Sequence, residues 1–458
     1  MSDTPRSGGF RVALIKPNIG VRVTTGQVDT APMEPLSLSV LGGLTPPEAQ
    51  TFLVDDRIEP IPYDKPTDLV AITVETYTAR RAYEIAQQYR RRGVPVIMGG
   101  MHPLLCPDEA AAHADSLLIG DAEGVWPGVV ADAMSGHLAP RYNCQTDQPI
   151  QAGTFPDRSL YGHRKYLPIH LMQYSRGCRY RCSYCAISSY FSARHFTRDP
   201  QEVVEEIRAA KSRFVFFVDD NLVGDHDRAK ELFRALIPLR IHWVSQGSID
   251  MLGDAELMDL MMRSGCLGHV IGFESLSDGS LHEMRKDVNR RFAHEQYREA
   301  IERIRKWGMQ VWSALTFGHD SDTLESIERT CSWTIDSKFT FAAFNVLMPY
   351  PGTPLYDSLA AQGRLLYDGR WWLHDDYRFN YAAFTPTNMS ADQLTQAAFQ
   401  CRSRFNSARS RISRAFEIHT NLRSPLRLGV YVAYNPVVRR EVFAKQGMTL
   451  GYESGGVP

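Results

Sequence analysis

Three of the eight cysteines in this 458-residue chain fall within eight residues, at Cys178, Cys182 and Cys185. This CxxxCxxC spacing is typical of a metal site, because thiolates are soft ligands for iron–sulfur clusters and zinc, and one short turn can direct three of them toward one point. Structural zinc sites and electron-transfer clusters normally use four protein ligands. A cluster held by only three cysteines would therefore keep one iron open for another ligand.

The segment 176–185 resembles the signature of radical S-adenosylmethionine (SAM) enzymes, CxxxCxφC, with Tyr184 as the aromatic residue. The resemblance implies a [4Fe–4S] cluster on Cys178, Cys182 and Cys185, with the amino and carboxylate groups of SAM chelating the fourth iron. Reduction would then cleave SAM to a 5′-deoxyadenosyl radical. The alternative is a zinc site of three cysteines with a distant fourth ligand such as His195.

The composition of the chain limits the classes of partner and the cellular compartment that we expect. Hydrophobic residues make up 43% and charged residues 22% of the chain, and the net charge is −1, so bulk charge indicates neither nucleic acid nor an anionic membrane as partner. The chain shows no secretory signal pattern and no run of about 18 apolar residues. Its other cysteines are scattered, which favours a reducing compartment, and we expect a cytoplasmic protein. They are Cys106, Cys144, Cys266, Cys331 and Cys401.

The first third of the chain reads as an α/β fold. Apolar runs alternate with helical patterns at 35–43 and 79–92, which predicts a doubly wound parallel sheet over about residues 10–140. The predicted strands are 11–16, 51–55, 69–74, 94–98 and 116–119. In such sheets the loops after the carboxyl ends of the strands form the ligand crevice.

These loops, together with residues 33–36, resemble the cobalamin-binding domain found upstream of radical SAM domains. The resemblance implies that they surround the corrin and its nucleotide tail. The candidate residues are Asn18, Glu34, Thr73, Glu75, Thr76, Tyr77, Gly99, Gly100, His102, Gly120 and Glu123. The glycine pair could instead be an ordinary strand-end turn, and His102 a solvated loop histidine.

One departure from that family matters. Cobalamin-dependent mutases carry Asp-x-His-x-x-Gly after the first strand, whereas residues 18–22 contain no histidine. This leaves two alternatives open. The lower face of cobalamin would meet a residue other than histidine, with Asn18, Thr76 or Tyr77 nearby, or the domain binds no cofactor.

After a period-free stretch rich in Pro, Gly, Gln and Asn, a second strand–helix alternation begins. It predicts a partial (β/α)6 TIM barrel with helices such as 200–212 and 293–306. The predicted strands are 171–174, 214–218, 242–245, 268–273, 310–315 and 342–348. The predicted parts are a Rossmann domain at 1–140, a linker at 141–169, the barrel at 170–365, and a mostly helical C-terminal region on the substrate side at 366–458.

Barrel chemistry belongs at the carboxyl ends of the strands. By the radical SAM resemblance, Asp219, Asp220 and Asn221 occupy the place of the Gly-Gly-Glu motif that holds the ammonium of SAM, for which a carboxylate is a suitable partner. The full set of implied SAM-binding residues is Tyr184, Asp219, Asp220, Asn221, Gln246, Glu274 and Ser275. Glu274 could instead cap the helix that begins near Asp278.

The C-terminal region is rich in aromatic and basic residues. Four of its residues could line a site for an apolar substrate, or could form the hydrophobic contact that packs this segment on the barrel. They are Trp371, Trp372, His374 and Tyr377. A basic helix predicted over 391–416 could contact a membrane surface or grip substrate anions, although a solvated helix face is the favoured interpretation.

The domain order, residues 73–83 and the aromatic C-terminal part resemble the methylases of hopanoids and bacteriochlorophylls. This implies cobalamin-dependent methylation at carbon of a largely apolar polycyclic or lipid-like small molecule, with an external reductant such as flavodoxin or ferredoxin. Two alternatives remain. One is oxidative cyclisation, ring rearrangement or hydroxylation, with cobalamin bound non-methylatively or not at all, and the other is a non-enzymatic iron–sulfur or zinc sensor.

Overall fold

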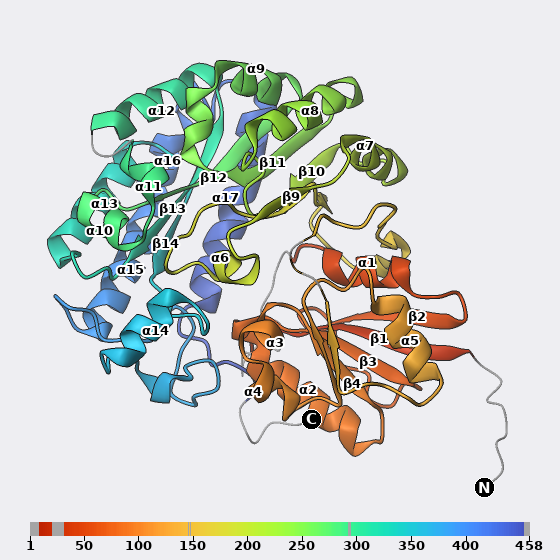
Figure 1. The fold of residues 1–458 in the computed structure, drawn as a ribbon. Helices are drawn as coiled ribbons and strands as arrows, with labels where there is room; N and C mark the ends of the chain where they lie inside the picture. The colour runs from red at the N-terminus through yellow and green to blue at the C-terminus, as the bar shows by residue number, and fades with distance from the viewer. Residues whose placement is uncertain (1–8, 21–31, 145, 147, 292–294, 453–458) are drawn as a thin grey trace, which may run out of the picture. The chain divides into compact units, whose positions relative to one another are not determined.

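The computed structural model describes residues 9–20, 32–144, 146, 148–291 and 295–452 (Figure 1). They form two compact units. The first contains the described residues of Met1–Leu167, Trp372–Asp376 and Met448–Pro458, and the second contains those of Pro168–Trp371 and Tyr377–Gly447. The predicted division into four parts stays a prediction.

The first unit is built on a six-stranded parallel sheet in the order β2-β1-β3-β4-β5-β6. Its strands are β1 (Phe10–Lys16), β2 (Ala49–Asp55), β3 (Leu69–Thr73), β4 (Val96–Gly99), β5 (Ser116–Ile119) and β6 (Arg141–Asn143). The five predicted strands are confirmed within a few residues. Sequence analysis missed β6, which is three residues long and largely exposed, so it has no apolar run to reveal it.

Helices cover both faces of this sheet. Helices α1 (Leu36–Leu44) and α5 (Trp126–Met134) bury one face, where Leu38 and Trp126 pack against Val12, Leu14 and neighbouring strand residues. Helix α2 (Ala79–Arg91) contacts β3 and β4, and α3 (Met101–Leu105) and α4 (Pro107–Ala111) pack beside it on the other side (Figure 1). The predicted doubly wound α/β fold is therefore confirmed.

The second unit is an open, six-stranded parallel sheet in the order β14-β13-β12-β11-β10-β7. The strands are β7 (His170–Met172), β10 (Phe214–Phe217), β11 (His242–Gly247), β12 (Cys266–Glu274), β13 (Gln310–Phe317) and β14 (Phe341–Val346). Strands that pair in chain order with helices between them form a partial (β/α)6 barrel, as predicted.

Helices pack on one face of this sheet and bury it. They include α7 (Pro200–Ala209), α8 (His226–Leu236), α9 (Ala255–Arg263), α12 (Glu295–Trp307) and α13 (Leu324–Asp336). Alternate strand residues such as Phe273 and Leu315 are completely buried beneath them, while Val270 and Ala314 on the other face are only half-buried. Residues 293 and 294 of the predicted helix 293–306 lie outside the described residues.

The predicted helix 391–416 is wrong in one respect, because it is two helices, α15 (Ala391–Phe405) and α16 (Ala408–Ala415). Ser407 has extended backbone, and its hydroxyl accepts a hydrogen bond from the Ser410 amide at 3.3 Å, which starts a new helix. Helix α17 (Pro425–Lys445) follows. Within the residues that the structure describes, no helix has the length and apolar content needed to span a bilayer.

Candidate functional site

The three cysteines lie on the loop between β8 (Ser175–Gly177) and α6 (Ala186–Tyr190). β8 pairs antiparallel with β9 (His195–Thr197), and Gly177 lies opposite His195. Gly177 has a φ of +79°, and a Cβ there would lie 2.2 Å from the Arg194 carbonyl oxygen. Only glycine fits this position, so the turn that carries the cysteines depends on it.

Two carboxylates from the carboxyl end of β10 hold the start of this loop. Asp219 is completely buried, and it accepts hydrogen bonds from the Tyr174 amide at 3.2 Å and from the amide and hydroxyl of Ser175. Asp220 accepts from the Gly177 amide at 2.7 Å. Both predicted SAM residues therefore position the cysteine loop, and their predicted contact with the SAM ammonium stays a prediction.

Asn221 connects the same loop to β11. Its Nδ2 lies 3.7 Å from Cys178 Sγ and 3.1 Å from Ser248 Oγ, and its Oδ1 accepts from the Ser248 amide at 3.1 Å. His195, the alternative zinc ligand, donates its Nε2–H to the Asn221 carbonyl at 3.1 Å. With its Nε2–H bonded in this way, the His195 ring could bind a metal only through Nδ1.

The thiols lie close enough to influence one another electrostatically. Burial raises the pKa of Cys178 and raises the pKa of Cys182 to about 11, and the nearby Lys286 ammonium opposes both shifts. Among the described residues, no three ligating side chains already surround one point. Three thiols on one turn beside a cation nevertheless have the donor chemistry that an iron–sulfur cluster needs, since its ligands are thiolates.

Glu274 lies at the carboxyl end of β12, where the register with β13 shifts after Gly272. It is buried and has a φ of +62°, a conformation that residues other than glycine rarely adopt. Its carboxylate accepts from Lys286 Nζ at 3.0 Å and from Thr316 Oγ1 at 2.8 Å, and Tyr184 also hydrogen-bonds it. The irregular backbone therefore serves a buried charged cluster, and Glu274 does not cap a helix.

Lys286 is the main residue that sequence analysis missed. Burial disfavours its charge, but Glu274 holds the pKa of Lys286 well above its ordinary value. Burial likewise raises the pKa of Glu274, and Lys286 outweighs this effect so that the carboxylate stays ionised. Lys286 follows Glu274 by twelve residues with no motif between them, so only the folded chain reveals the pair.

The other two predicted SAM residues lie at the same edge of the sheet. Gln246 is half-buried near the carboxyl end of β11, on the face without helices. Ser275 directly follows β12, and its Oγ accepts from the Ser277 amide at 3.1 Å. The structure thus gathers all seven predicted SAM residues in one unit, around strand ends and the cysteine loop.

In the first unit, the predicted cobalamin loops meet at the carboxyl edge of the sheet. The loops after β3 and β4 are tied by backbone hydrogen bonds from Val74 to Gly99, at 2.8 Å, and from His102 to Val74, at 3.0 Å. The Asn18 amide donates to Asp56 at 3.1 Å, and Asn18 Oδ1 accepts from the Ile19 amide at 2.8 Å. The edge is therefore an ordered surface.

The glycines of this edge are explained by the loops themselves. Gly100 and Gly120 both have a φ of +103°. A Cβ would lie 2.9 Å from the Val74 carbonyl oxygen at Gly100, and 2.6 Å from the Cys144 carbonyl oxygen at Gly120. A Cβ at Gly99 would make ordinary contact with Leu118. The glycines alone are therefore no sign of a bound cofactor.

His102 is completely buried rather than solvated. Its Nδ1 lies 3.3 Å from Thr76 Oγ1, and its Nε2 lies 3.1 Å from both Tyr83 Oη and Glu109 Oε1. Glu109 also accepts from Trp372 Nε1 at 2.9 Å. Burial raises the pKa of Glu109, but these hydrogen bonds outweigh burial and lower it. His102 is thus part of a polar network inside the unit.

The remaining predicted cobalamin residues differ in their exposure and in their contacts. Glu75 is exposed and forms an ion pair with Lys16 at 2.6 Å, and Glu34 is buried and pairs with Arg158. Thr73 ends β3, Tyr77 lies in the short 3₁₀ helix η1 (Thr76–Thr78), and Glu123 lies between β5 and α5. The role of this set in binding cobalamin stays a prediction.

The aromatic segment divides between the two units. Trp371 and Tyr377 are completely buried in the second unit, where their rings are 5.0 Å apart and Trp371 donates to the Pro349 carbonyl at 2.9 Å. Trp372 is buried in the first unit against His102, and His374 is half-buried. The complete burial of Trp371 and Tyr377 is what the alternative of a packing seam predicts. The substrate role of the four residues stays a prediction.

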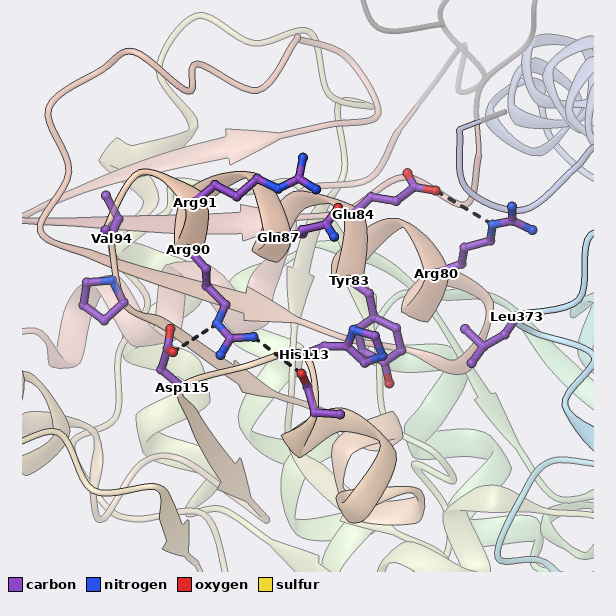
Figure 2. Close-up of a pocket in the computed structure, with 13 residues that line it drawn as sticks. Arg80, Tyr83, Glu84, Gln87, Arg90, Arg91, Val94, His113, Asp115 and Leu373 are labelled. Atoms are coloured by element: carbon purple, nitrogen blue, oxygen red, sulfur yellow. Dashed lines mark hydrogen bonds and ion pairs between the residues drawn. The ribbon is translucent and has the colours of Figure 1, made fainter. Parts of the chain in front are cut away.

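A separate cavity of about 870 Å³ opens beside α2 in the first unit (Figure 2). Tyr83 stacks on His113 at 3.9 Å between ring centroids, and Arg90 forms an ion pair with Asp115 at 3.0 Å. Gly93, Val94 and Pro95, which precede β4, also line the cavity. It therefore extends toward the amino end of the sheet, and none of its described lining residues is a predicted cofactor residue.

Comparison with known proteins agrees with this geometry. The family described as the radical SAM superfamily matches residues 172–334. The chain is 30% identical over 354 residues to bacteriochlorophyllide d C-8(2)-methyltransferase of Chlorobaculum tepidum, covering 72% of this chain and 77% of that protein. It is 25% identical to the hopanoid C-2 methylase of Rhodopseudomonas palustris, covering 73% and 66%.

A solved structure resembles the fold over both units. It is the radical SAM methyltransferase TsrM from Kitasatospora setae, with cobalamin and a [4Fe–4S] cluster bound, at a TM-score of 0.62 and 17% identity. The match covers 78% of this chain and 75% of that one.

Proposed function

This chain belongs to the radical SAM superfamily, as an enzyme of the methyltransferase type, and we propose that it methylates carbon in an apolar, polycyclic small molecule with the help of cobalamin. The observation that carries the proposal is the cysteine loop. It is positioned by Asp219 and Asp220 and lies beside the Glu274–Lys286 ion pair at the carboxyl edge of a partial barrel.

When bound, the cofactors would supply the reactive groups: a 5′-deoxyadenosyl radical from the [4Fe–4S] cluster with SAM, and a methyl group from cobalamin. The protein supplies position and charge. Cys178, Cys182 and Cys185 would ligate the cluster, and Lys286 stabilises the thiolate form of the first two. Asn221 is within reach of Cys178 Sγ and would orient it.

Cobalamin binding in the first unit is supported by its doubly wound sheet with loops gathered at one edge, and by the TsrM likeness. A sheet edge with ordered loops suits a large planar ligand. Because residues 18–22 contain no histidine, we propose that the lower face of the cofactor would meet Asn18, Thr76 or Tyr77. Residues 21 and 22 lie outside the described residues.

The substrate class is supported by two relatives that act on large apolar ring systems, a bacteriochlorophyllide and a hopanoid. We further propose that a flavodoxin or ferredoxin supplies the electron, since a [4Fe–4S] cluster of this kind needs a strong reductant. A reducing cytoplasm suits this chemistry and the eight free cysteines.

The test is anaerobic reconstitution with iron, sulfide, SAM and cobalamin. We expect stoichiometric cobalamin, a [4Fe–4S] spectrum, and 5′-deoxyadenosine formed with strong reductant. A full iron–sulfur complement without cobalamin uptake would contradict the methyl-transfer proposal, and no 5′-deoxyadenosine would favour a sensor. Metabolite profiling of a deletion strain should then reveal a polycyclic compound that lacks one methyl group.

A further inference from the structure

The C-terminal part of the second unit presents an unusual concentration of exposed apolar side chains. Of the eight large hydrophobic residues that are exposed among the described residues, five lie between positions 412 and 432. They are Ile412, Phe416, Ile418, Leu422 and Val432, with exposed fractions from 39% to 66%. We refer to these five residues as the 412–432 surface. Single exposed hydrophobic residues are ordinary, but a contiguous group usually marks an interaction site.

The five residues lie near one another. Ile412 and Phe416 are four residues apart, so they project from the same side at the end of α16. Ile418 and Leu422 follow in the connection to α17, and Tyr431 Oη donates to the Arg411 carbonyl at 2.7 Å. That hydrogen bond joins α17 to α16, and Val432 follows Tyr431 on α17.

The segment is held from within by buried polar side chains. Arg414 donates to the Thr340 carbonyl at 2.6 Å, and Arg427 donates to the Cys266 carbonyl at 3.2 Å. Asn421 Oδ1 accepts from Gln310 Nε2 at 3.1 Å and from Thr340 Oγ1 at 2.7 Å. These partners stand at the amino ends of β12, β13 and β14. Buried polar side chains thus hold the segment on the sheet, while the five apolar side chains are exposed.

Most of the charged residues in this segment are positive. Residues 405–440 include seven arginines and one acidic residue, Glu417. Glu417 is buried and accepts from the amide and hydroxyl of Thr420 at 2.6 Å. Arg409 precedes Ile412 in the sequence, Arg423 follows Leu422, and both arginines are exposed. The surface therefore combines outward apolar groups with a positive rim.

We propose that the 412–432 surface docks on an anionic lipid bilayer. Ile412, Phe416 and Ile418 would enter the headgroup region, and Arg409 and Arg423 would contact lipid phosphates. A second copy of the chain fits less well, because pairing this surface with itself would bring arginines of both copies together without acidic partners.

Docking would concentrate the enzyme where a lipid-like substrate dissolves. The surface lies at the amino ends of the strands, and the cysteine loop lies at their carboxyl ends, so the two do not compete. Vesicle binding needs neither cluster nor cobalamin. Its failure would therefore leave the proposed methyl transfer untouched, and the two proposals can fail separately.

The test is co-sedimentation of the full chain with vesicles of phosphatidylglycerol and phosphatidylcholine, against vesicles of phosphatidylcholine alone. We expect binding to the anionic vesicles, weakened by salt and at least about tenfold weaker without phosphatidylglycerol. The double variant Phe416→Ser/Ile418→Ser should bind about tenfold more weakly. Arg409→Gln and Arg423→Gln should each lower binding about fivefold.

Leu324→Ser is the matched control, because Leu324 is 43% exposed in the same unit but far along the chain from the surface. It should bind vesicles like the unaltered protein, and all variants should retain their far-ultraviolet circular dichroism and 5′-deoxyadenosine formation. The proposal is overturned if the unaltered protein does not sediment with anionic vesicles, or if Phe416→Ser/Ile418→Ser binds equally well. A dimer in analytical ultracentrifugation that this variant abolishes would assign the surface to a second copy instead.

Discussion

The two sheets of this protein carry their candidate sites at equivalent edges but build them differently. In the second unit, a contiguous loop provides three cysteines, and buried charges from β10 and β12 hold that loop and its surroundings. In the first unit, four separate loops contribute, and their glycines and His102 are used by contacts inside the unit. A site built on one short segment can therefore be recognised from residue types and spacing in the sequence. A site built from several loops cannot, because the sequence does not show which loops meet.

The largest expected effect concerns the cysteines. Replacing Cys178, Cys182 or Cys185 with Ala should abolish cluster assembly and 5′-deoxyadenosine formation, because a two-thiolate site cannot retain the cluster. Iron content, visible spectra and product analysis provide the measurement. Cys144→Ala, a half-buried cysteine of the first unit, should keep full activity. Cleavage of SAM by any of the three variants would show that the second unit is not the radical-forming half.

Lys286→Met tests the buried charges beside that loop. It leaves Glu274 ionised and unpaired, so we expect a loss of about 3 kcal/mol in the free energy of unfolding, together with slower 5′-deoxyadenosine formation. Adding Glu274→Gln should restore part of the stability, which denaturant titration can measure. The exposed Lys306→Met serves as control. If Lys286→Met were as stable as the unaltered protein, the buried ion pair would not stabilise the second unit, and this difference between the two units would be contradicted.

His102→Ala tests the network of the first unit. Tyr83 and Glu109 would lose a buried partner, which should cost about 1–3 kcal/mol in unfolding free energy. Cobalamin content should fall, while 5′-deoxyadenosine formation should persist because the cysteine loop is unchanged. The exposed His137→Ala is the matched control. If His102→Ala lost SAM cleavage with its cluster intact, the two sites would not be separable.

Titration of Asp219 should make the free energy of unfolding depend on pH. Burial raises its pKa from 3.8 to about 7, although hydrogen bonds from Ser175 and Tyr174 oppose the shift. The folded state therefore holds a proton that the unfolded state releases above its ordinary pKa. This stabilisation is present at low pH and is lost as pH rises from about 4 to 7, by at most about 1.4 kcal/mol per pH unit.

Asp219→Asn removes that titration. The free energy of unfolding of both proteins can be measured with urea at pH 5, 6 and 7. The difference between the unaltered protein and the variant should become smaller at each higher pH. A constant difference across the three pH values would contradict the raised pKa.

Much of the architecture could be predicted from the sequence because its strands are long apolar runs. The six barrel strands and five of the six strands of the first sheet were placed this way. β6 was missed because it is short and exposed, and the break at Ser407 was missed because the apolar spacing of 391–416 continues through it. Lys286 and Thr316 were missed because they reach Glu274 from separate elements.

By itself the sequence determined the cluster motif of the radical SAM superfamily, since ligand type and spacing lie within eight residues and depend on one local turn. It also determined the order of the two α/β units, through the periodicity of their strands. Only the tertiary structure decided that Asp219 and Asp220 hold the cysteine loop, that His102 is an internal network residue, and that Lys286 joins Glu274. These roles depend on which distant segments folding brings within hydrogen-bond distance and away from water, and linear spacing does not encode that.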